Sequence, residues 1–514
     1  MMSLMLPMPW ELQLFCWKSK NDLSMKKIIQ TFIAVLFATA VYAEDVLQVV
    51  PFKAQPGTTS NDACYFSIVM NNDAADIWAF QFDILLPEGM AFDNTGGLDP
   101  FELGDRCPYT IGRGGVKNWK HTIQYSFLDD GWCRVVVFTT DADRITGDSG
   151  EVLRAYYLTD TGMQEGVHPI LIRNSVLTIS GTADLKPDDS SSYCIVGDLS
   201  LQGGVADFSS LTGYVPSWTL NSLADELALT EGFTALDIRN AESFGCNLAL
   251  PNPNALCYVM DGSVAGNITT GNAVVCGEEY SCEKLNLHDG DYSFSSVYNV
   301  ECLSASFNRE FPAGLWSTIV LPFDVDEMQM SALVQSGVTV ERLVSYDACN
   351  NTIYFEPVEC MQANIPYIIK CSNTMIPFAD VEIESFASTA DANGISVDGI
   401  SMIANYRNNV LNSDSENRYY VYDAANGEFV LVGKNCKVSP FRTYITIPAS
   451  KASGKSMSVS HIGGDYTSVD KNVVATAVAE DVYTTSGVKV EEVSAIGTLR
   501  KGVYIIGNRK VLVK

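Results

Sequence analysis

The stretch IWAFQFDILL, residues 77–86, decides the fold of the first part of this chain. Apolar side chains stand at every second position from Trp78 to Leu86, and smaller or polar residues such as Gln81 and Asp83 lie between most of them. Successive side chains of a β-strand point to opposite faces, so this alternation predicts a half-buried strand. Pro87-Glu88-Gly89 ends it with a turn.

The same alternation recurs between Asp45 and about Thr182, with turn signals between the runs and no amphipathic helix. The recurrences are Phe66-Ile68-Met70, Ile123-Tyr125-Phe127, Val135-Val137, Leu153-Ala155-Tyr157 and Ile170-Ile172. Many short strands of this kind predict an all-β fold, with a jelly-roll-like antiparallel β-sandwich over residues 44–183.

The rest of the chain is also strand-rich. A Pro, Asp, Ser and Gly-rich segment, 184–213, is predicted to be a linker, and residues 214–462 form a second β-rich region with a possible internal boundary near 373. Asn426-Gly427 predicts a hairpin, and one short helix is expected between a capping Asp326 and Gly337. Residues 463–480 suit a linker, and 481–514 a small β-sandwich-like domain.

The N-terminal region predicts export. Lys26-Lys27, the apolar run 28–41 and the small-residue exit at Ala43 are typical of a signal peptide over 25–43, which makes 1–24 a non-native extension. The run is shorter than the roughly 20 residues of a membrane span, so we expect cleavage, no span afterwards, and a secreted or surface protein.

The net charge of the chain limits the classes of binding partner that we expect. The chain carries 33 Lys and Arg against 61 Asp and Glu, a net charge of −28; residues 1–43 contribute +2, which leaves −30 after cleavage. A phosphate backbone requires a basic surface, so nucleic acid is not an expected partner.

Thirteen cysteines follow the leader, at wide and irregular spacings. We expect mostly buried single thiols, with Cys276 and Cys282 the best candidates for a local disulfide. No C-x-x-C occurs and the four histidines stand far apart, so structural zinc is not expected.

Catalytic signatures are missing from the sequence. No G-x-S-x-G elbow and no phosphate-binding glycine loop with its lysine is present, so we expect no enzyme and no cofactor. A glycoside hydrolase needs only two facing carboxylates, which have no spacing signature, and it stays open as an alternative.

Candidate ligand contacts are aromatic residues beside polar neighbours, because sugar rings stack on aromatic faces while their hydroxyls bond to carboxylates and amides. Trp119 and Trp132 fit best, with Tyr109 and Asp105 as lesser candidates. The densest group of oxygen ligands, a possible structural calcium site, is Asp141, Asp143, Asp148 and Glu151.

Three segments resemble known families. In residues 46–182, the order of Leu47–Val50, Pro56-Gly57, Cys64–Met70, Ile77–Pro87, Val135–Phe138 and Thr146–Leu153 resembles the cohesin-like carbohydrate-binding superfamily. That resemblance implies a sandwich that docks a protein or a sugar, without catalysis.

The other two resemblances concern location. Residues 214–446, with Asn252–Tyr258, Leu285–Gly290, Trp316–Phe323, Pro366–Ile369 and Pro440–Tyr444, resemble an uncharacterised β module of surface proteins of Gram-negative anaerobes. The tail 481–514, with Val482–Gly487, Leu499–Ile506 and Lys510–Lys514, is similar to the C-terminal sorting domains of type IX secretion substrates.

Together these features predict a non-catalytic protein, secreted or on the outer surface of a Gram-negative bacterium. Its cohesin-like domain would bind a polysaccharide or a surface protein, and its tail would engage the secretion machinery. The alternatives are a polysaccharide-acting hydrolase and a structural surface-layer or adhesion component.

Overall fold

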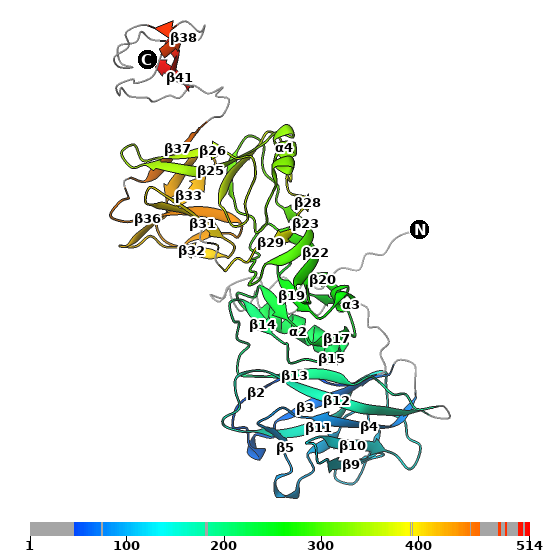
Figure 1. Cartoon of the computed structure of the whole chain (residues 1–514). Coiled ribbons are helices and arrows are strands. Elements are labelled where there is room, and N and C mark those ends of the chain that lie inside the picture. Colours follow the sequence, from blue (N-terminus) through cyan, green and yellow to red (C-terminus); the bar gives the residue numbers. More distant parts are fainter. Residues whose placement is uncertain are drawn as a thin grey trace, which may run out of the picture. The chain divides into compact units, whose positions relative to one another are not determined.

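The computed structural model describes residues 46–72, 76–179, 183–390, 392, 394–452 and 454–462, and the backbone of four strands between 482 and 513. The predicted extension 1–24, signal peptide 25–43 and linker 463–480 lie outside the described residues. Most of the described chain is β, as predicted, and it divides into two compact units, residues 1–278 and 279–514 (Figure 1).

The first unit begins with two sheets that pack face to face. The first sheet is antiparallel and comprises β1 (Val46–Val49), β3 (Tyr65–Asn71), β5 (Met90–Phe92), β6 (Phe101–Leu103) and β11 (Ser149–Thr159). The second comprises β2 (Phe52–Ala54), β4 (Ile77–Leu85), β9 (Thr122–Phe127), β10 (Cys133–Phe138), β12 (Gly166–Ile179), β13 (Ser190–Val196), β15 (Gly213–Val215) and β17 (Ala241–Phe244). The hairpin of β7 (Tyr109–Ile111) and β8 (Lys117–Trp119) extends from them.

The predicted strand at 77–86 is β4, at the centre of the second sheet. It pairs antiparallel with β10, where Phe82 lies opposite Val135, and with β12. Phe80, Phe82 and Ile84 are fully buried in a core to which both sheets contribute, because alternate side chains of β4 face the other sheet. The sandwich prediction is confirmed.

The segment predicted to be a linker contributes a strand instead. β13 lies between β12 and β15, and all seven of its residues are buried. Cys194 and Val196 belong to the sandwich core, whereas Tyr193 and Ile195 face a second core on the other side of the sheet. The polar Ser190 to Ser192 run looked like a loop, but its hydroxyls are satisfied within the fold; that of Ser192 donates to the carbonyl oxygen of Val49 at 2.7 Å.

The second core of unit 1 is enclosed by a coil of parallel strands that the sequence did not reveal. Its elements are β14 (Val205–Asp207), α2 (Ser217–Leu229), β16 (Ala235–Asp237), β18 (Leu248–Ala249), β19 (Leu256–Val259), α3 (Gly262–Ala265), β20 (Ile268–Thr270) and β21 (Asn272–Cys276). Strands β14, β16, β19 and β21 pair in parallel in this order. Helix α2 buries Leu220, Leu223 and Leu227 against the same core.

The second unit contains a parallel pair of nine-residue strands and a large ten-stranded sheet. The pair is β22 (Tyr280–His288) with β23 (Val300–Asn308), and β28 (Val381–Glu382) and β29 (Ser385–Phe386) join β23. The ten-stranded sheet has the order β24 (Trp316–Ile319), β27 (Tyr367–Cys371), β25 (Val338–Asp347), β26 (Thr352–Pro357), β37 (Ser456–His461), β34 (Glu428–Leu431), β33 (Asn417–Asp423), β36 (Arg442–Pro448), β31 (Ile400–Asn405) and β30 (Ile395–Val397). A separate ladder joins β32 (Asn409–Leu411) to β35 (Cys436–Val438).

Two local predictions in this unit are confirmed. Helix α4 (Glu327–Gln335) begins after Asp326, whose carboxylate accepts from the backbone N–H of Gln329 at 2.7 Å, and Gly337 follows the helix with φ of 92°. Strands β33 and β34 form the predicted hairpin, in which Asp423 lies opposite Glu428.

The tail contains one antiparallel sheet in the order β39 (Lys489–Val490), β38 (Val482–Thr484), β40 (Gly502–Ile506) and β41 (Arg509–Val513). The prediction of a small β unit holds, although the described strands make a single sheet. No helix in the described part of the chain is long and apolar enough to cross a membrane.

Candidate functional site

Three of the four predicted ligand contacts gather at the β7–β8 hairpin. Tyr109 lies opposite Trp119 in the ladder, and the two rings meet edge to face with centroids 5.0 Å apart. The ammonium of Lys117 lies 4.6 Å from the Tyr109 ring centroid and 4.9 Å from that of Trp119, and it forms a 2.7 Å ion pair with Asp105. The hairpin therefore holds an aromatic pair, a cation and a carboxylate together.

This ion pair sets the charge of the cluster. The hydrogen bond from Lys117 lowers the pKa of Asp105, and the same contact raises the pKa of Lys117. Both side chains are exposed to solvent, so the pair orients the hairpin surface and adds little stability.

Trp119 also lines a cavity of about 250 Å³ between strands β6 and β9, which belong to opposite sheets. The other lining residues are Asp99, Phe101, Glu102, Leu103, His121, Ile123 and Tyr125. The aromatic rings of Trp119 and Tyr125 are half-buried, whereas Asp99 is exposed at the rim. We call this hollow the β6–β9 cavity.

Polar groups are placed around the β6–β9 cavity. The hydroxyl of Tyr125 lies 3.5 Å from a carboxylate oxygen of Asp99. Burial raises the pKa of Tyr125, and the negative charge of Asp99 raises it further. Glu102 accepts a 2.9 Å hydrogen bond from Tyr156. His121 is 4% exposed, and its Nε2 lies 3.0 Å from the carbonyl oxygen of Trp78.

The fourth predicted contact, Trp132, lies elsewhere. It follows strand β9, and the guanidinium of Arg173 stacks over its ring at 3.9 Å while pairing with Asp130 at 2.7 Å. Trp132 does not line the β6–β9 cavity. Its ring is covered by a side chain of its own sheet, so the sequence correctly indicated a loop position but not a contribution to this site.

The four predicted calcium ligands do not converge. Glu151 is engaged by Ser67 at 2.5 Å and by Arg154 at 2.9 Å, while Asp141, Asp143 and Asp148 are spread along the loop between β10 and β11. Among the described residues, no three His, Cys, Asp or Glu side chains lie close enough to hold one metal ion.

A guanidinium occupies the centre of this loop instead. Arg106, 8% exposed, donates from Nε to the carbonyl oxygen of Thr146 and from Nη1 to that of Met70, both at 2.6 Å. Its Nη2 donates to Asn72 Oδ1 at 2.6 Å and to the carbonyl oxygen of Gly147. One buried cation thus gathers carbonyl and amide oxygens of this loop and of the end of β3, which are not the carboxylates that the sequence suggested for calcium.

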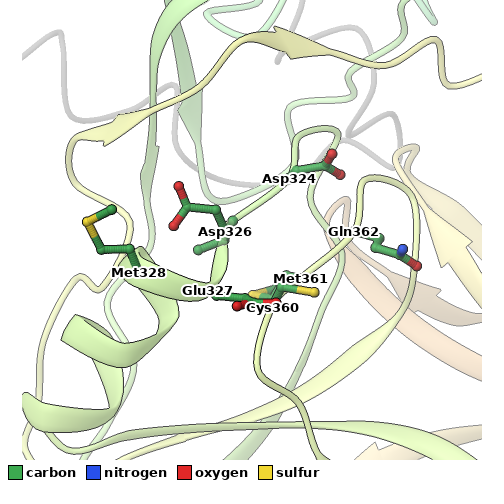
Figure 2. A pocket seen from close by; sticks show the side chains of 8 residues that line it. Asp324, Asp326, Glu327, Met328, Cys360, Met361 and Gln362 are labelled. Carbon is green, nitrogen blue, oxygen red and sulfur yellow. The ribbon is translucent and has the colours of Figure 1, made fainter.

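A larger hollow of about 790 Å³ lies in the second unit at the start of α4 (Figure 2). Figure 2 shows Asp324 and Asp326 beside the helix start, with Cys360, Met361 and Gln362 on a facing loop. Two of its carboxylates have structural partners, since Asp324 accepts from the N–H of Ala363 at 2.6 Å and Asp326 caps the helix. No aromatic ring lines it, so the β6–β9 cavity is the better candidate for a binding site.

Sequence reasoning missed Asp99, Glu102, His121 and Tyr125 as site residues. Tyr125 was recognised only as part of an alternating strand. The other residues come together because β6, which is only three residues long, lies close to β9 of the opposite sheet. The one available signal was the crowding of aromatic and acidic residues between 99 and 125.

No known protein family matches this sequence, and no curated protein resembles it significantly. The solved structures found to be similar include cohesin modules. One is from a Clostridium perfringens family 33 glycoside hydrolase, with 9% identity over 30% of this chain and 96% of that one, and a TM-score of 0.22. Another is from a Clostridium thermocellum cohesin–dockerin complex, with 12% identity, 31% and 99% coverage, and a TM-score of 0.22. A third is a non-cellulosomal cohesin from Archaeoglobus fulgidus, with 9% identity, 30% and 93% coverage, and a TM-score of 0.21.

Proposed function

We propose that this chain is a non-catalytic secreted or cell-surface protein whose first sandwich binds a carbohydrate in the β6–β9 cavity. One observation supports it above the others: two aromatic residues, Trp119 and Tyr125, and two acidic residues, Asp99 and Glu102, line one small hollow. Aromatic faces bind the C–H surface of a sugar, and carboxylates accept from its hydroxyls. Export is supported by the leader-like sequence 25–43 and by the tail that is similar to type IX sorting domains.

A hydrolase is the second candidate, because two acidic residues, Asp99 and Glu102, line the same cavity. Glu102 is held by Tyr156 and lies 3.9 Å from Arg154, so it is engaged by side chains of its own sheet. This arrangement favours recognition of a ligand over proton transfer to one.

A protein partner is the third candidate. The tip of the β7–β8 hairpin exposes Ile111 and Val116, at 64% and 62%, and apolar tips of this kind are available to a partner surface. This arrangement would also suit an adhesion or surface-layer component.

The test is a glycan array and polysaccharide pull-down with the full chain, run beside a Trp119→Ala variant. We expect a specific glycan signal that Trp119→Ala weakens about tenfold or more, since buried aromatic anchors carry much of a binding energy. Trp132→Ala is the matched control, because its ring is stacked under Arg173 and lies outside the cavity. Uniformly flat responses to plant, mucin and host glycans would contradict sugar recognition, and release of reducing ends would favour the hydrolase.

A further inference from the structure

Two cysteines lie directly opposite each other on neighbouring parallel strands of the second unit. In the ladder of β22 and β23, Cys282 is the register partner of Cys302. Both are buried, at 6% and 3% exposure, and both are free thiols. Register partners on adjacent strands project their side chains to the same face of the sheet, so the two sulfurs face one another.

Contacts on either side hold the strands in this register. The rings of Tyr280 and Tyr298 stack with centroids 4.2 Å apart just before the cysteine pair. Beyond it, the hydroxyl of Ser306 donates to Asn286 Oδ1 at 2.9 Å. A slip of one residue would break both contacts and turn one thiol to the opposite face.

The spacing of strands suits a covalent link. Neighbouring strands lie about 4.8 Å apart, and disulfides join residues whose Cα atoms are about 4.4–6.8 Å apart. We propose that Cys282 and Cys302 form a cross-strand disulfide when the chain folds in the presence of an exchangeable disulfide, such as oxidised glutathione or the disulfide of an oxidoreductase.

The chemistry proceeds by two thiol–disulfide exchanges. The hydrogen bond with Cys282 lowers the pKa of Cys302, which favours its thiolate, while the same contact and burial raise the pKa of Cys282. The Cys302 thiolate attacks the oxidant's disulfide and releases one oxidant thiolate. Cys282, after losing its proton to water, attacks Sγ of Cys302 and releases the second thiolate. The two protein thiols lose two protons and two electrons, and the oxidant's disulfide is reduced to two thiols.

The chain offers an internal control. Cys257 and Cys276 also lie on adjacent parallel strands, β19 and β21, but Cys257 is the partner of Ala273, three residues away from Cys276. Strand proximity alone therefore exists at both places, whereas opposed register exists only at Cys282 and Cys302 among these four cysteines.

The test compares the full chain produced in an oxidising bacterial periplasm with the same chain from a reducing cytoplasm. Free thiols are alkylated in denaturant, and the chain is digested and mapped by mass spectrometry. We expect a peptide pair joined through Cys282 and Cys302, lighter by two hydrogens, only in the periplasmic protein, with Cys257 and Cys276 alkylated in both. Amide exchange between 283 and 301 should be roughly tenfold slower in the oxidised protein.

Two variants complete the test, which does not depend on glycan binding. Cys302→Ser should leave Cys282 alkylated, and Cys276→Ser should leave the linked peptide unchanged. The proposal is overturned if both thiols of the periplasmic protein are alkylated, or if Cys282 is joined to any cysteine other than Cys302.

Discussion

At the scale of single residues, Arg106 determines the shape of the loop between β10 and β11. Its guanidinium donates to the carbonyl oxygens of Thr146 and Gly147 in the loop and to oxygens of Met70 and Asn72 at the end of β3, and it is almost fully buried. Burial lowers its pKa, yet a guanidinium stays charged at any physiological pH. A buried cation satisfied by several oxygens fixes those oxygens in place.

Replacing this cation should destabilise the sandwich strongly. Arg106→Met removes the buried hydrogen bonds that the guanidinium donates to the loop and to β3, and we expect a loss of about 3 kcal/mol or more in the free energy of unfolding. Urea denaturation followed by amide exchange of β3 and β11 measures it. Arg106→Lys keeps the charge without the forked geometry and should recover less than half. A loss below about 1 kcal/mol for Arg106→Met would show that water replaces the guanidinium.

His121 gives the sandwich a dependence on pH. Burial, the largest effect, lowers the pKa of His121, while an unfolded histidine titrates near 6.5. Below about pH 6.5 the unfolded chain therefore binds a proton that the folded chain does not, so the stabilisation present above pH 6.5 is lost as the pH falls. We expect the urea midpoint of the first unit to decrease between pH 7.5 and 5.

His121→Gln should flatten this decrease, because glutamine can still donate to the Trp78 carbonyl and does not titrate. His168→Gln is the control, since the ring of His168 is only half-buried and its Nε2 lies 2.8 Å from the carbonyl oxygen of Gln164. An equal pH slope in wild type and His121→Gln would assign the effect to other groups.

At the scale of elements, helix α2 covers the second core of unit 1 with one face. Leu223 is completely buried there, whereas Leu229 at the helix end is 54% exposed. Leu223→Ala should lower the free energy of unfolding by about 3 kcal/mol, because it removes buried methyl groups and leaves a cavity. Leu229→Ala should change it by less than about 0.5 kcal/mol. Thermal denaturation of the two variants makes the comparison, and similar effects would place α2 outside the cooperative core.

The elements also show what a sequence can and cannot predict. β4, the β33–β34 hairpin and α4 were predictable, because alternation, a turn dipeptide and a capping residue are local signals. β13 was not, since three serines resemble a loop until the carbonyls that accept from them are known. The parallel strands of two to five residues carry no local signature, and α2 went unnoticed although Leu220, Leu223 and Leu227 share a helical face.

The candidate site shows the same division. The pairing of aromatic and polar residues near Trp119 was visible in the sequence. Trp119 lies near Asp99 and Glu102 because β6 and β9, which belong to different sheets, lie close to each other across the sandwich. Residue spacing in the sequence does not predict this contact. The predicted calcium ligands are acids that lie close together in the sequence, and the sequence did not show that Arg106 donates to the carbonyl oxygens of this loop.

At the scale of the whole molecule, strand β13 contributes side chains to the cores of both the sandwich and the parallel coil of unit 1, so we expect the two to fold together. A fragment of residues 44–183 lacks β13, which would leave one edge of β12 unpaired and remove Cys194 and Val196 from the core. We expect this fragment to aggregate or unfold without cooperativity, and residues 44–278 to unfold in one transition. Size-exclusion chromatography and urea denaturation distinguish them. A cooperative, soluble 44–183 fragment that retains glycan binding would contradict this view.

The burial of β13 on both faces also bears on how this protein can evolve. A side chain on an ordinary strand has to fit one hydrophobic core. Along 193–196, neighbouring side chains have to fit two different cores, one on each face of the sheet. Amino-acid substitutions should therefore accumulate more slowly in β13 than in β12, which is partly exposed. Among descendants of a common ancestor, the sandwich and the coil should be inherited together, and recombination should seldom separate them.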